Sequence, residues 1–464
     1  MEIVKSIRGQ WADANIPRYV VFVGFMLLCA LGGGSSRDDV LSLIYLRPAA
    51  VVAIALLAVL PGRWDFATVR VPLLLLAALA ALIALQLVPL PPSLWPALPG
   101  HARFVAIADL VGQPQPRRPV SLSPDRTINS LLALLPALVV LIGFAGLGER
   151  ERMSLLLAPV VIGVASAILA VAQLGAGNDS ALQLYRLSNL GGANGFFANR
   201  NHEAALLALG LPCLAAWAGR SLDPAMTQRN AVIALTIAVL LAPMILITGS
   251  RAGVVVGGLA FVLAVLLLIP ARARLAPTPR ARLVLIGAVV APVVLAALVL
   301  GLGRAVGVDR LLNQSVTHGE QRLDMAPIVV DLVREYFPFG IGFGAFDPAF
   351  RIAEPDWVLH RTFFNHAHND LLEIVLTGGL VATLLFAIAL GWWAWRARAL
   401  VIQVFRTRGT AGLTGLAGVA IASLLLVASL VDYPVRTPLL TAILAIAVGL
   451  TAMTQKAPRP PMAR

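Results

Sequence analysis

Charged residues are the first thing that this chain has little of. Asp, Glu, Lys and Arg make up 13% of its 464 residues, whereas soluble proteins carry about 25%. Hydrophobic residues account for 59% of the chain. A chain so poor in polar side chains cannot cover an aqueous surface, which argues against a soluble globular protein.

Cysteines and nucleotide-binding motifs are also scarce or missing. The only two cysteines, Cys29 and Cys213, both lie inside apolar runs. They cannot form a disulfide framework or a zinc site, so we interpret them as buried, inert thiols. The sequence also has no glycine-rich loop ending in Gly-Lys-Ser/Thr, and nucleotide hydrolysis is therefore not supported.

Long apolar runs are what the chain does have. Many are roughly 17 to 25 residues long, enough to cross a hydrocarbon layer of about 30 Å, and lipid forces such runs to be helical because it offers the backbone no hydrogen bonds. We predict an all-α integral membrane protein with about twelve transmembrane helices. The predicted spans are 17–34, 47–61, 71–90, 127–147, 153–174, 201–218, 231–248, 252–270, 283–303, 370–395, 412–431 and 437–453. The run 47–61 is short and could instead be re-entrant or tilted.

Basic residues predict the orientation of these spans. They gather in every second connection and at both ends of the chain: Lys5 and Arg8; Arg63 and Arg70; Arg150 and Arg152; Arg220 and Arg229; Arg272, Arg274, Arg280 and Arg282; Arg396, Arg398, Arg406 and Arg408; Lys456, Arg459 and Arg464. With these on the inside, both termini are cytoplasmic and the long loops 91–126 and 304–369 lie outside. The net charge of +13 then reflects topology and anionic lipid, and no nucleic-acid partner is expected.

The two outer loops differ in character. Loop 91–126 is rich in proline and should be extended and locally stiff. In loop 304–369, residues 320–337 have an apolar face at helical spacing, which predicts an amphipathic helix lying at the outer membrane surface. That face consists of Leu323, Ile328, Leu332 and Tyr336.

Three alternating glycines follow this predicted helix: Gly340, Gly342 and Gly344. Glycine allows tight turns and lets the backbone approach a ligand or another helix closely. The same glycines could also form a simple turn that ends the helix.

Four polar clusters lie on the outer side, where charges in or near lipid are costly and mark functional candidates. The first is Asn199-Arg200-Asn201-His202-Glu203. Capping and the dipole of a helix starting there explain the asparagine and the glutamate. They do not explain Arg200, whose charge opposes a helix N-terminus unless an anion binds.

Two further clusters each contain one arginine. Arg251 lies in the tight turn TGSRAG (248–253), which has no acidic residue. It either extends toward lipid headgroups or binds a phosphate that the small residues allow to approach. Arg322, in GEQR (319–322), is on its own better interpreted as an exposed surface arginine.

The fourth cluster, NHAHNDLLE (365–373), opens a predicted span. If the helix starts near Asn369, one polar stripe runs into the bilayer. The stripe consists of His366, Asp370, Glu373 and Thr377. Capping by Asn369 and Asp370 explains only part of it. His366 and His368 could bind a metal, but no third ligand of matching type is near, so no metal site is expected.

Together these residues suit a reaction whose leaving group is an anionic phosphate. Arginine binds phosphate oxygens through paired hydrogen bonds and stays charged. A histidine can take the proton of an attacking hydroxyl.

The same residues resemble the O-antigen ligase and polymerase family of bacterial membrane glycosyltransferases. The matching segments are FFANRNHEAA (196–205), TGSRAG (248–253), GEQRLDMAPIVVDLVREYFPFGIGFGAF (319–346) and HAHNDLLEIVLTGGL (366–380). They have the order and spacing of the family's shared C-terminal module, whereas the spans before residue 190 match only in topology. Many relatives carry a glutamate where this chain has Thr377, which leaves the role of Glu373 open.

The resemblance implies a GT-C-like glycosyltransferase of the bacterial inner membrane that needs no metal or other cofactor. Such enzymes take a glycan from undecaprenyl diphosphate at the periplasmic face and transfer it to an acceptor glycan, to lipid A–core or, in some relatives, to a protein hydroxyl. By motif, Arg200, Arg251 and Arg322 would hold the donor diphosphate, and His368 would lie nearest the acceptor.

The remaining candidate residues and the domain boundaries complete this hypothesis. We assign His366 as a second catalytic residue. The supporting residues are Asn369, Asp370, Glu373 and His202. We expect N-terminal helices in 1–190, the catalytic module in 191–395, and C-terminal helices with a basic cytoplasmic tail in 396–464.

Alternative functions differ in the acceptor or in the chemistry. Ligase and polymerase share one reaction and differ in acceptor, so both stay open, as does a protein O-oligosaccharyltransferase. A lipid-linked-glycan flippase should line a central cavity with charges along several spans. In this sequence the charges gather at one membrane face, which favours an enzyme.

Overall fold

The structure of the protein is a computed structural model that describes residues 15–177, 180–189, 192–272, 275, 317–356, 364–407 and 412–453, with only the backbone given for 317–324 and for Thr407. Apart from one isolated bridge between Leu90 and Arg118, the elements in these residues are helical. The longer helices are α2 (Ile16–Gly32), α3 (Leu43–Val59), α4 (Phe66–Leu85), α6 (Pro124–Leu132), α7 (Leu135–Gly146), α9 (Ala158–Ala176), α10 (Arg200–Gly219), α11 (Pro224–Ile247), α12 (Arg251–Leu268), α15 (Thr317–Tyr336), α17 (Asp370–Thr407), α18 (Leu413–Ala428) and α19 (Pro438–Ala452). The shorter ones are η1 (Trp95–Ala97), α5 (Ala102–Leu110), α8 (Glu149–Ser154), η2 (Leu155–Leu157), η3 (Ile269–Ala271), α16 (Phe346–Ala353) and η5 (Pro434–Arg436).

The predicted membrane helices correspond to apolar helices wherever the structure describes them. Within the described residues, seven helical segments are long and apolar enough to cross a membrane, and four shorter apolar helices accompany them. The predicted span 283–303 and the tail from Lys456 lie outside the described residues. The chain is therefore an integral membrane protein by its helices, and a total of about twelve spans stays a prediction.

Several predicted boundaries differ from the observed ones. The spans predicted at 47–61 and 71–90 begin earlier, as α3 and α4, and the side chain of Asp65 caps α4 by accepting a hydrogen bond from Thr68 N at 3.2 Å. The span predicted at 127–147 is divided into α6 and α7. Pro136 near the start of α7 has no backbone N–H to continue the ladder of α6.

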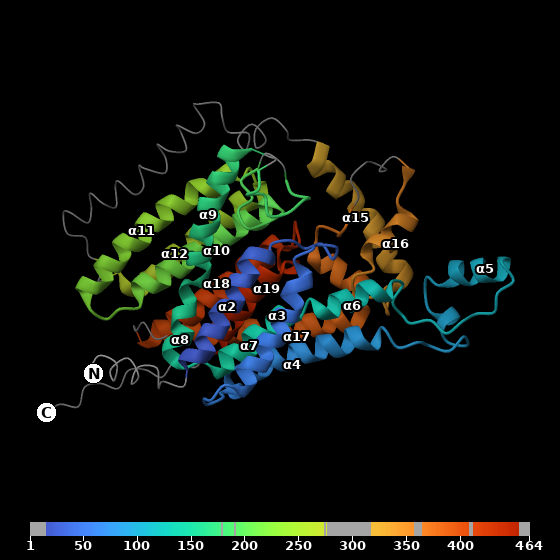
Figure 1. Ribbon diagram of the computed structural model, residues 1–464, viewed down its shortest axis with the longest axis horizontal. Helices are drawn as coiled ribbons and strands as arrows, with labels where there is room; N and C mark the ends of the chain where they lie inside the picture. The colour runs from blue at the N-terminus through green and yellow to red at the C-terminus, as the bar shows by residue number, and fades with distance from the viewer. Residues whose placement is uncertain are drawn as a thin grey trace.

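The helices pack as a bundle in which α10 lies at the centre (Figure 1). α10 contacts α9, α11, α12 and α18, and 94% of its apolar segment is buried. Helices at the outside of the bundle, such as α3 and α11, expose large apolar side chains instead, including Val51, Leu56 and Leu240. An exposed apolar surface of this kind suits a lipid environment.

One end of the bundle collects the starts of α10, α17 and α19 and the ends of α2 and α18. Leu439 N donates to Gly33 O at 2.9 Å, and Asp370 N donates to Ser429 O at 2.9 Å. The side chain of Asn201 donates to Asp432. We call this the site end, because the first and the fourth polar clusters predicted from sequence meet there.

The predicted amphipathic helix is confirmed as α15, but its apolar face packs inside the protein. Met325, Val329, Leu332 and Tyr336 are buried in a second small core. α16 and the first turns of α17 supply the other side of that core, with Phe346, Phe350 and Leu376. The described part of α15 therefore braces the start of α17 against α16 (Figure 1).

The glycine segment after α15 packs against a break in α17. Gly379 has a φ of 61° and a ψ of −154°, so the long helix is kinked there. Ile341 N and Gly342 N, both at 3.0 Å, donate to the carbonyls of Leu376 and Thr377 that the kink frees. The structure supports both interpretations of these glycines, because Gly340 N also donates to the carbonyl of Tyr336 at 2.9 Å and so ends α15 in a turn.

Candidate active site

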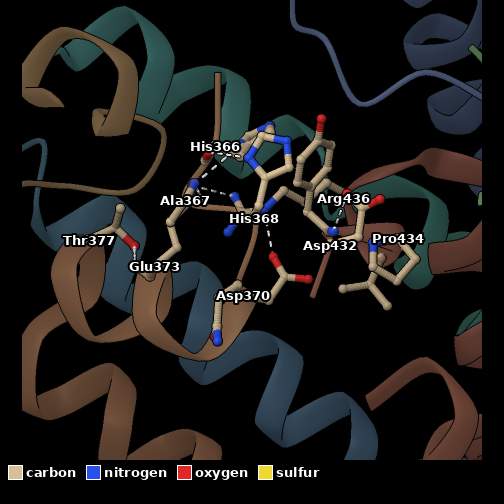
Figure 2. A network of polar contacts seen from close by, with 12 residues as sticks. His366, Ala367, His368, Asp370, Glu373, Thr377, Asp432, Pro434 and Arg436 are labelled. Carbon is tan, nitrogen blue, oxygen red and sulfur yellow. Dashed lines mark hydrogen bonds and ion pairs between the residues drawn. The ribbon is translucent and has the colours of Figure 1, made fainter. Parts of the chain in front are cut away.

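The fourth polar cluster forms a tight turn in front of α17, as the sequence predicts. Asn369 caps the helix by accepting a hydrogen bond from Leu372 N at 3.0 Å. Glu373, one turn into the helix, is buried. Its carboxylate accepts from Ala367 N at 2.8 Å and lies 3.1 Å from His366 Nδ1 (Figure 2). Glu373 therefore holds the histidine turn against the helix.

His368 has an unusual backbone conformation. Its φ of 54° makes it the only non-glycine residue in the described part of the chain with a positive φ. Its Nδ1 lies 3.0 Å from the carbonyl of His366. Because a carbonyl only accepts, Nδ1 carries the proton, and a neutral His368 ring presents its lone pair on Nε2.

Arg436 is an active-site candidate that the sequence interpretation did not name. It follows α18 in the short helix η5, and its guanidinium contacts Asp370 (Nε to Oδ1, 2.8 Å) and Glu373 (Nη1 to Oε1, 3.1 Å) (Figure 2). Burial opposes its charge, but the carboxylates of Glu373 and Asp370 outweigh burial and raise the pKa of Arg436 above its ordinary value. Arg436 therefore supplies the positive charge that two buried carboxylates require.

Tyr433 lies among three histidine rings. The ring centroids of His366, His368 and His202 are 4.5, 5.0 and 5.5 Å from that of Tyr433. The contacts with His368 and His202 are edge-on, the arrangement that aromatic rings favour. Tyr433 thus joins the first and the fourth polar clusters, which are more than 160 positions apart in the sequence.

The first polar cluster is confirmed as a helix start. Asn199 caps α10 by accepting from Asn201 N at 2.9 Å, and His202 is buried with its Nε2 3.8 Å from Asp432 Oδ1. Arg200 is the first residue of α10, and its backbone N–H donates to Asn189 Oδ1 at 3.0 Å.

The other two predicted arginines belong to α12 and α15. Arg251 is exposed as the first residue of α12, after Ser250, whose hydroxyl accepts from Gly253 N at 2.8 Å. The starts of α10 and α12 belong to the two helices that pack most extensively against each other. Arg322 lies in α15 at a position where only the backbone is described.

A cavity of about 520 Å³ opens beside the histidine turn. Its lining includes His366, Asp370 and Arg436. It also includes Arg37, Arg47 and Arg126, from the N-terminal third of the chain. Neither Arg200 nor Arg251 is among the described residues of its lining. In the described residues, no group of three His, Cys, Asp or Glu side chains is placed to hold a metal.

The site residues that sequence analysis did not identify share one feature, their position between two predicted spans. Asp432, Tyr433 and Arg436 stand in the turn 431–437 between the last two predicted spans, on the predicted outer side. The rule that singled out Arg251, an arginine at the outer edge of two spans, applies equally to Arg436. Their contact with the histidine turn, across more than 60 positions, could not be predicted from spacing.

The comparison with known families fits this geometry. The sequence model of the family described as O-Antigen ligase matches residues 236–387. The chain carries an O-antigen ligase domain. The matched segment contains Arg251 and the whole histidine turn, together with Glu373 and Gly379, while Arg47 and Arg436 lie outside it. No curated protein sequence matches the chain.

The O-antigen ligase domain supports a role in the biosynthesis of polysaccharides. Members act as ligases or polymerases, which implies a glycosyltransferase-type reaction between a lipid-linked glycan and an acceptor. The apolar helices place this reaction in an integral membrane protein.

Proposed function

We propose that the protein is a metal-independent glycosyltransferase that moves a glycan from undecaprenyl diphosphate to an acceptor hydroxyl at the periplasmic face of the inner membrane. The observation that supports this most is the histidine turn, held by Glu373 and Arg436 at the site end of the bundle, inside the O-antigen ligase domain. The acceptor is lipid A–core for a ligase or a growing glycan for a polymerase.

His368 acts as the general base in this proposal. The contact of its Nδ1 with the carbonyl of His366 fixes the tautomer and leaves Nε2 to accept the proton of the acceptor hydroxyl. The hydroxyl oxygen then bonds to the anomeric carbon as the bond from that carbon to the diphosphate oxygen breaks. The positive φ of His368 supports the assignment, since strained conformations of this kind persist mainly where function requires them.

The arginines stabilise the departing diphosphate. We retain Arg200, Arg251 and Arg322 as its ligands, because guanidinium groups bind phosphate oxygens in pairs and keep their charge. Arg200 and Arg251 begin two neighbouring helices, whose N-terminal dipoles also favour an anion. His366 is assigned a catalytic role from sequence, but because Glu373 holds its Nδ1 we now propose that it positions the turn, as Arg436 does.

The decisive experiment supplies one donor and two acceptors. Purified full-length protein is incubated with undecaprenyl-diphosphate glycan and either core lipid or a second lipid-linked glycan, and mass spectrometry detects which acceptor gains mass. Transfer to core lipid identifies a ligase, and transfer to the lipid-linked glycan identifies a polymerase. The proposal is refuted if neither acceptor gains mass, or if the His368→Ala protein transfers at the same rate as the unaltered protein.

A further inference from the structure

The lining of the cavity beside the histidine turn combines arginines with apolar side chains. The arginines are Arg37, Arg47, Arg126 and Arg436. The apolar side chains include Leu46, Leu79 and Ile83, from α3 and α4. A ligand that matched both surfaces would have an anionic head and a hydrocarbon chain.

Three of these four arginines already have carboxylate partners. Arg37 contacts Asp39 at 2.6 Å, and Arg126 contacts the buried Asp347 at 2.9 Å and Asp38 at 3.9 Å. Arg436 contacts Asp370, as described above. These ion pairs keep the three guanidinium groups in place.

Arg47 is the exception. Among the described residues its hydrogen-bond partner is the neutral side chain of Asn129, at 3.0 Å. No carboxylate of the described residues lies within ion-pair distance of it, and its Nε is buried without a partner. Asp38, in the same cavity lining, favours its charge from a longer distance. A guanidinium in an apolar helix is costly when no anion contacts it directly. An anion bound in the cavity would supply that contact.

A second cavity adjoins the first. It has a volume of about 340 Å³ and is lined only by leucine and alanine side chains of α4, α6 and α7, with Leu134 between the last two. Leu132, Leu134 and Leu135 belong to the linings of both cavities. They lie where α6 gives way to α7, so the interruption of this span brings the polar and the apolar cavity together.

We infer that these cavities bind a lipid with a phosphate headgroup, with the phosphate on Arg47 and the hydrocarbon chain along the apolar cavity. This inference rests on the proposed function, because the bound lipid would lie beside the histidine turn. It adds binding residues from helices α3, α4, α6 and α7, which precede the O-antigen ligase domain. The source of the phosphate is either a membrane phospholipid or the polyprenyl diphosphate donor, in which case Arg47 replaces Arg200 and Arg251 as a ligand of the donor phosphate.

The test measures lipid binding to full-length protein in detergent by native mass spectrometry. The probes are undecaprenyl diphosphate, phosphatidylglycerol and inorganic diphosphate. Arg47→Gln should weaken binding of the phosphate lipid by about 10- to 100-fold, the effect of losing a hydrogen bond to a charged group. Arg70→Gln, an exposed arginine in α4, is the matched control and should bind like the unaltered protein.

A second variant distinguishes binding of the lipid's hydrocarbon chain from binding of its headgroup. Ala80→Phe fills the apolar cavity, so it should weaken binding of the lipid while leaving inorganic diphosphate unaffected. A loss confined to undecaprenyl diphosphate identifies the donor as the ligand, and a loss confined to phosphatidylglycerol identifies a phospholipid. The inference is overturned if Arg47→Gln binds every probe normally, if Arg70→Gln loses as much, or if Ala80→Phe binds both lipids normally.

The same preparations distinguish this inference from the proposed function. If Arg47→Gln binds lipid normally and transfer activity is intact, the cavity site is refuted and the proposed transferase function stands. If lipid binding depends on Arg47 but neither acceptor gains a glycan, the cavity site stands and the proposed transferase function is refuted. Thermal unfolding of each variant shows whether a loss of binding reflects a loss of folded protein.

Discussion

His368 is held in a conformation that its own backbone disfavours. A positive φ costs a non-glycine residue on the order of 1–3 kcal/mol, so its surroundings must maintain it. The carbonyl of His366 and the ring of Tyr433 both contact its imidazole. The imidazole is therefore oriented before any substrate arrives, as a general base requires.

Replacement of His368 tests this assignment. His368→Ala should lower turnover by about 10² to 10⁴-fold, the range for loss of a general base, and should still bind the lipid-linked donor. His366→Ala should reduce turnover less, because its role is to orient the turn. Turnover is measured in membranes and normalised to protein level. Unaltered turnover in His368→Ala, or a decrease explained wholly by protein level, would contradict the assignment.

Arg251 tests whether the diphosphate needs paired hydrogen bonds. Arg251→Lys keeps the charge but loses the planar fork of the guanidinium, so transfer should fall strongly while the protein still accumulates in membranes. Arg251 is exposed, and the substitution should leave folding intact. If lysine supports the same transfer rate as arginine, simple charge suffices and the proposed role is wrong.

Arg436 neutralises two buried carboxylates, so its removal should lower the free energy of unfolding. Arg436→Gln should destabilise the protein by about 3–5 kcal/mol, because Asp370 and Glu373 would be left buried without a counter-charge. The matched control is Arg334→Gln in α15, whose ion pair with Asp331 is exposed and should change stability by no more than about 0.5 kcal/mol. Thermal unfolding in detergent measures both, and equal melting temperatures would disprove the structural role of Arg436.

At the scale of elements, the start of α17 depends on parts of the chain far from it in sequence. Gln86, just after α4, donates from its side chain to the carbonyl of Thr377 at 2.9 Å and accepts from Phe343 N at 3.0 Å. Leu380 N donates to the carbonyl of Pro338 at 2.8 Å. The kink at Gly379 is thus hydrogen-bonded on both sides, which keeps it in place although it interrupts a helix within lipid.

Two glycines of the same helix provide a paired test of this kink. An added Cβ at Gly379 would collide with the carbonyl oxygen of Pro338, whereas at Gly391 it would meet no atom within 4 Å. Gly379→Ala should destabilise the protein by about 1–3 kcal/mol and reduce transfer. Gly391→Ala should be neutral or stabilising by up to about 1 kcal/mol. Similar melting curves for the two variants would show that the kink is not required.

The sequence predicts elements that depend on local pattern and misses contacts that depend on folding. Apolar runs and caps at Asn199 and Asn369 are local, and the structure confirms them. The sequence also predicts the apolar face of α15, but it does not predict that α16 and α17 cover this face. An amphipathic pattern shows that one face of a helix is buried and does not show which element covers it. The sequence does not identify Arg47 or Arg436 as site residues, because their roles depend on neighbours that only the fold brings close. Arg436 contacts two carboxylates, whereas Arg47 contacts the neutral side chain of Asn129.

At the scale of the whole molecule, orientation in the membrane is the prediction with the widest consequences. The site end should face the periplasm and the opposite end the cytoplasm. Ser93→Cys, exposed in the loop after α4, and Leu222→Cys, exposed before α11, report on the two ends. Both natural cysteines are buried, so background labelling should be low. An impermeant thiol reagent should label Ser93→Cys in cells with a permeabilised outer membrane, and labelling of Leu222→Cys instead would reverse the topology.

The interrupted α17 also constrains the order in which the protein can mature. The turn that carries His368 is fastened by the ion pairs of Arg436 with Asp370 and Glu373. The kink further along α17 is fastened by hydrogen bonds with Gln86 and with residues 338–342. Arg436 is synthesised last of these residues. A nascent chain that has inserted α17 but not the segment with Arg436 therefore has every residue of the histidine turn and lacks the counter-charge for Asp370 and Glu373. We therefore expect the turn to reach its final geometry, and transfer to begin, only after that segment has been inserted.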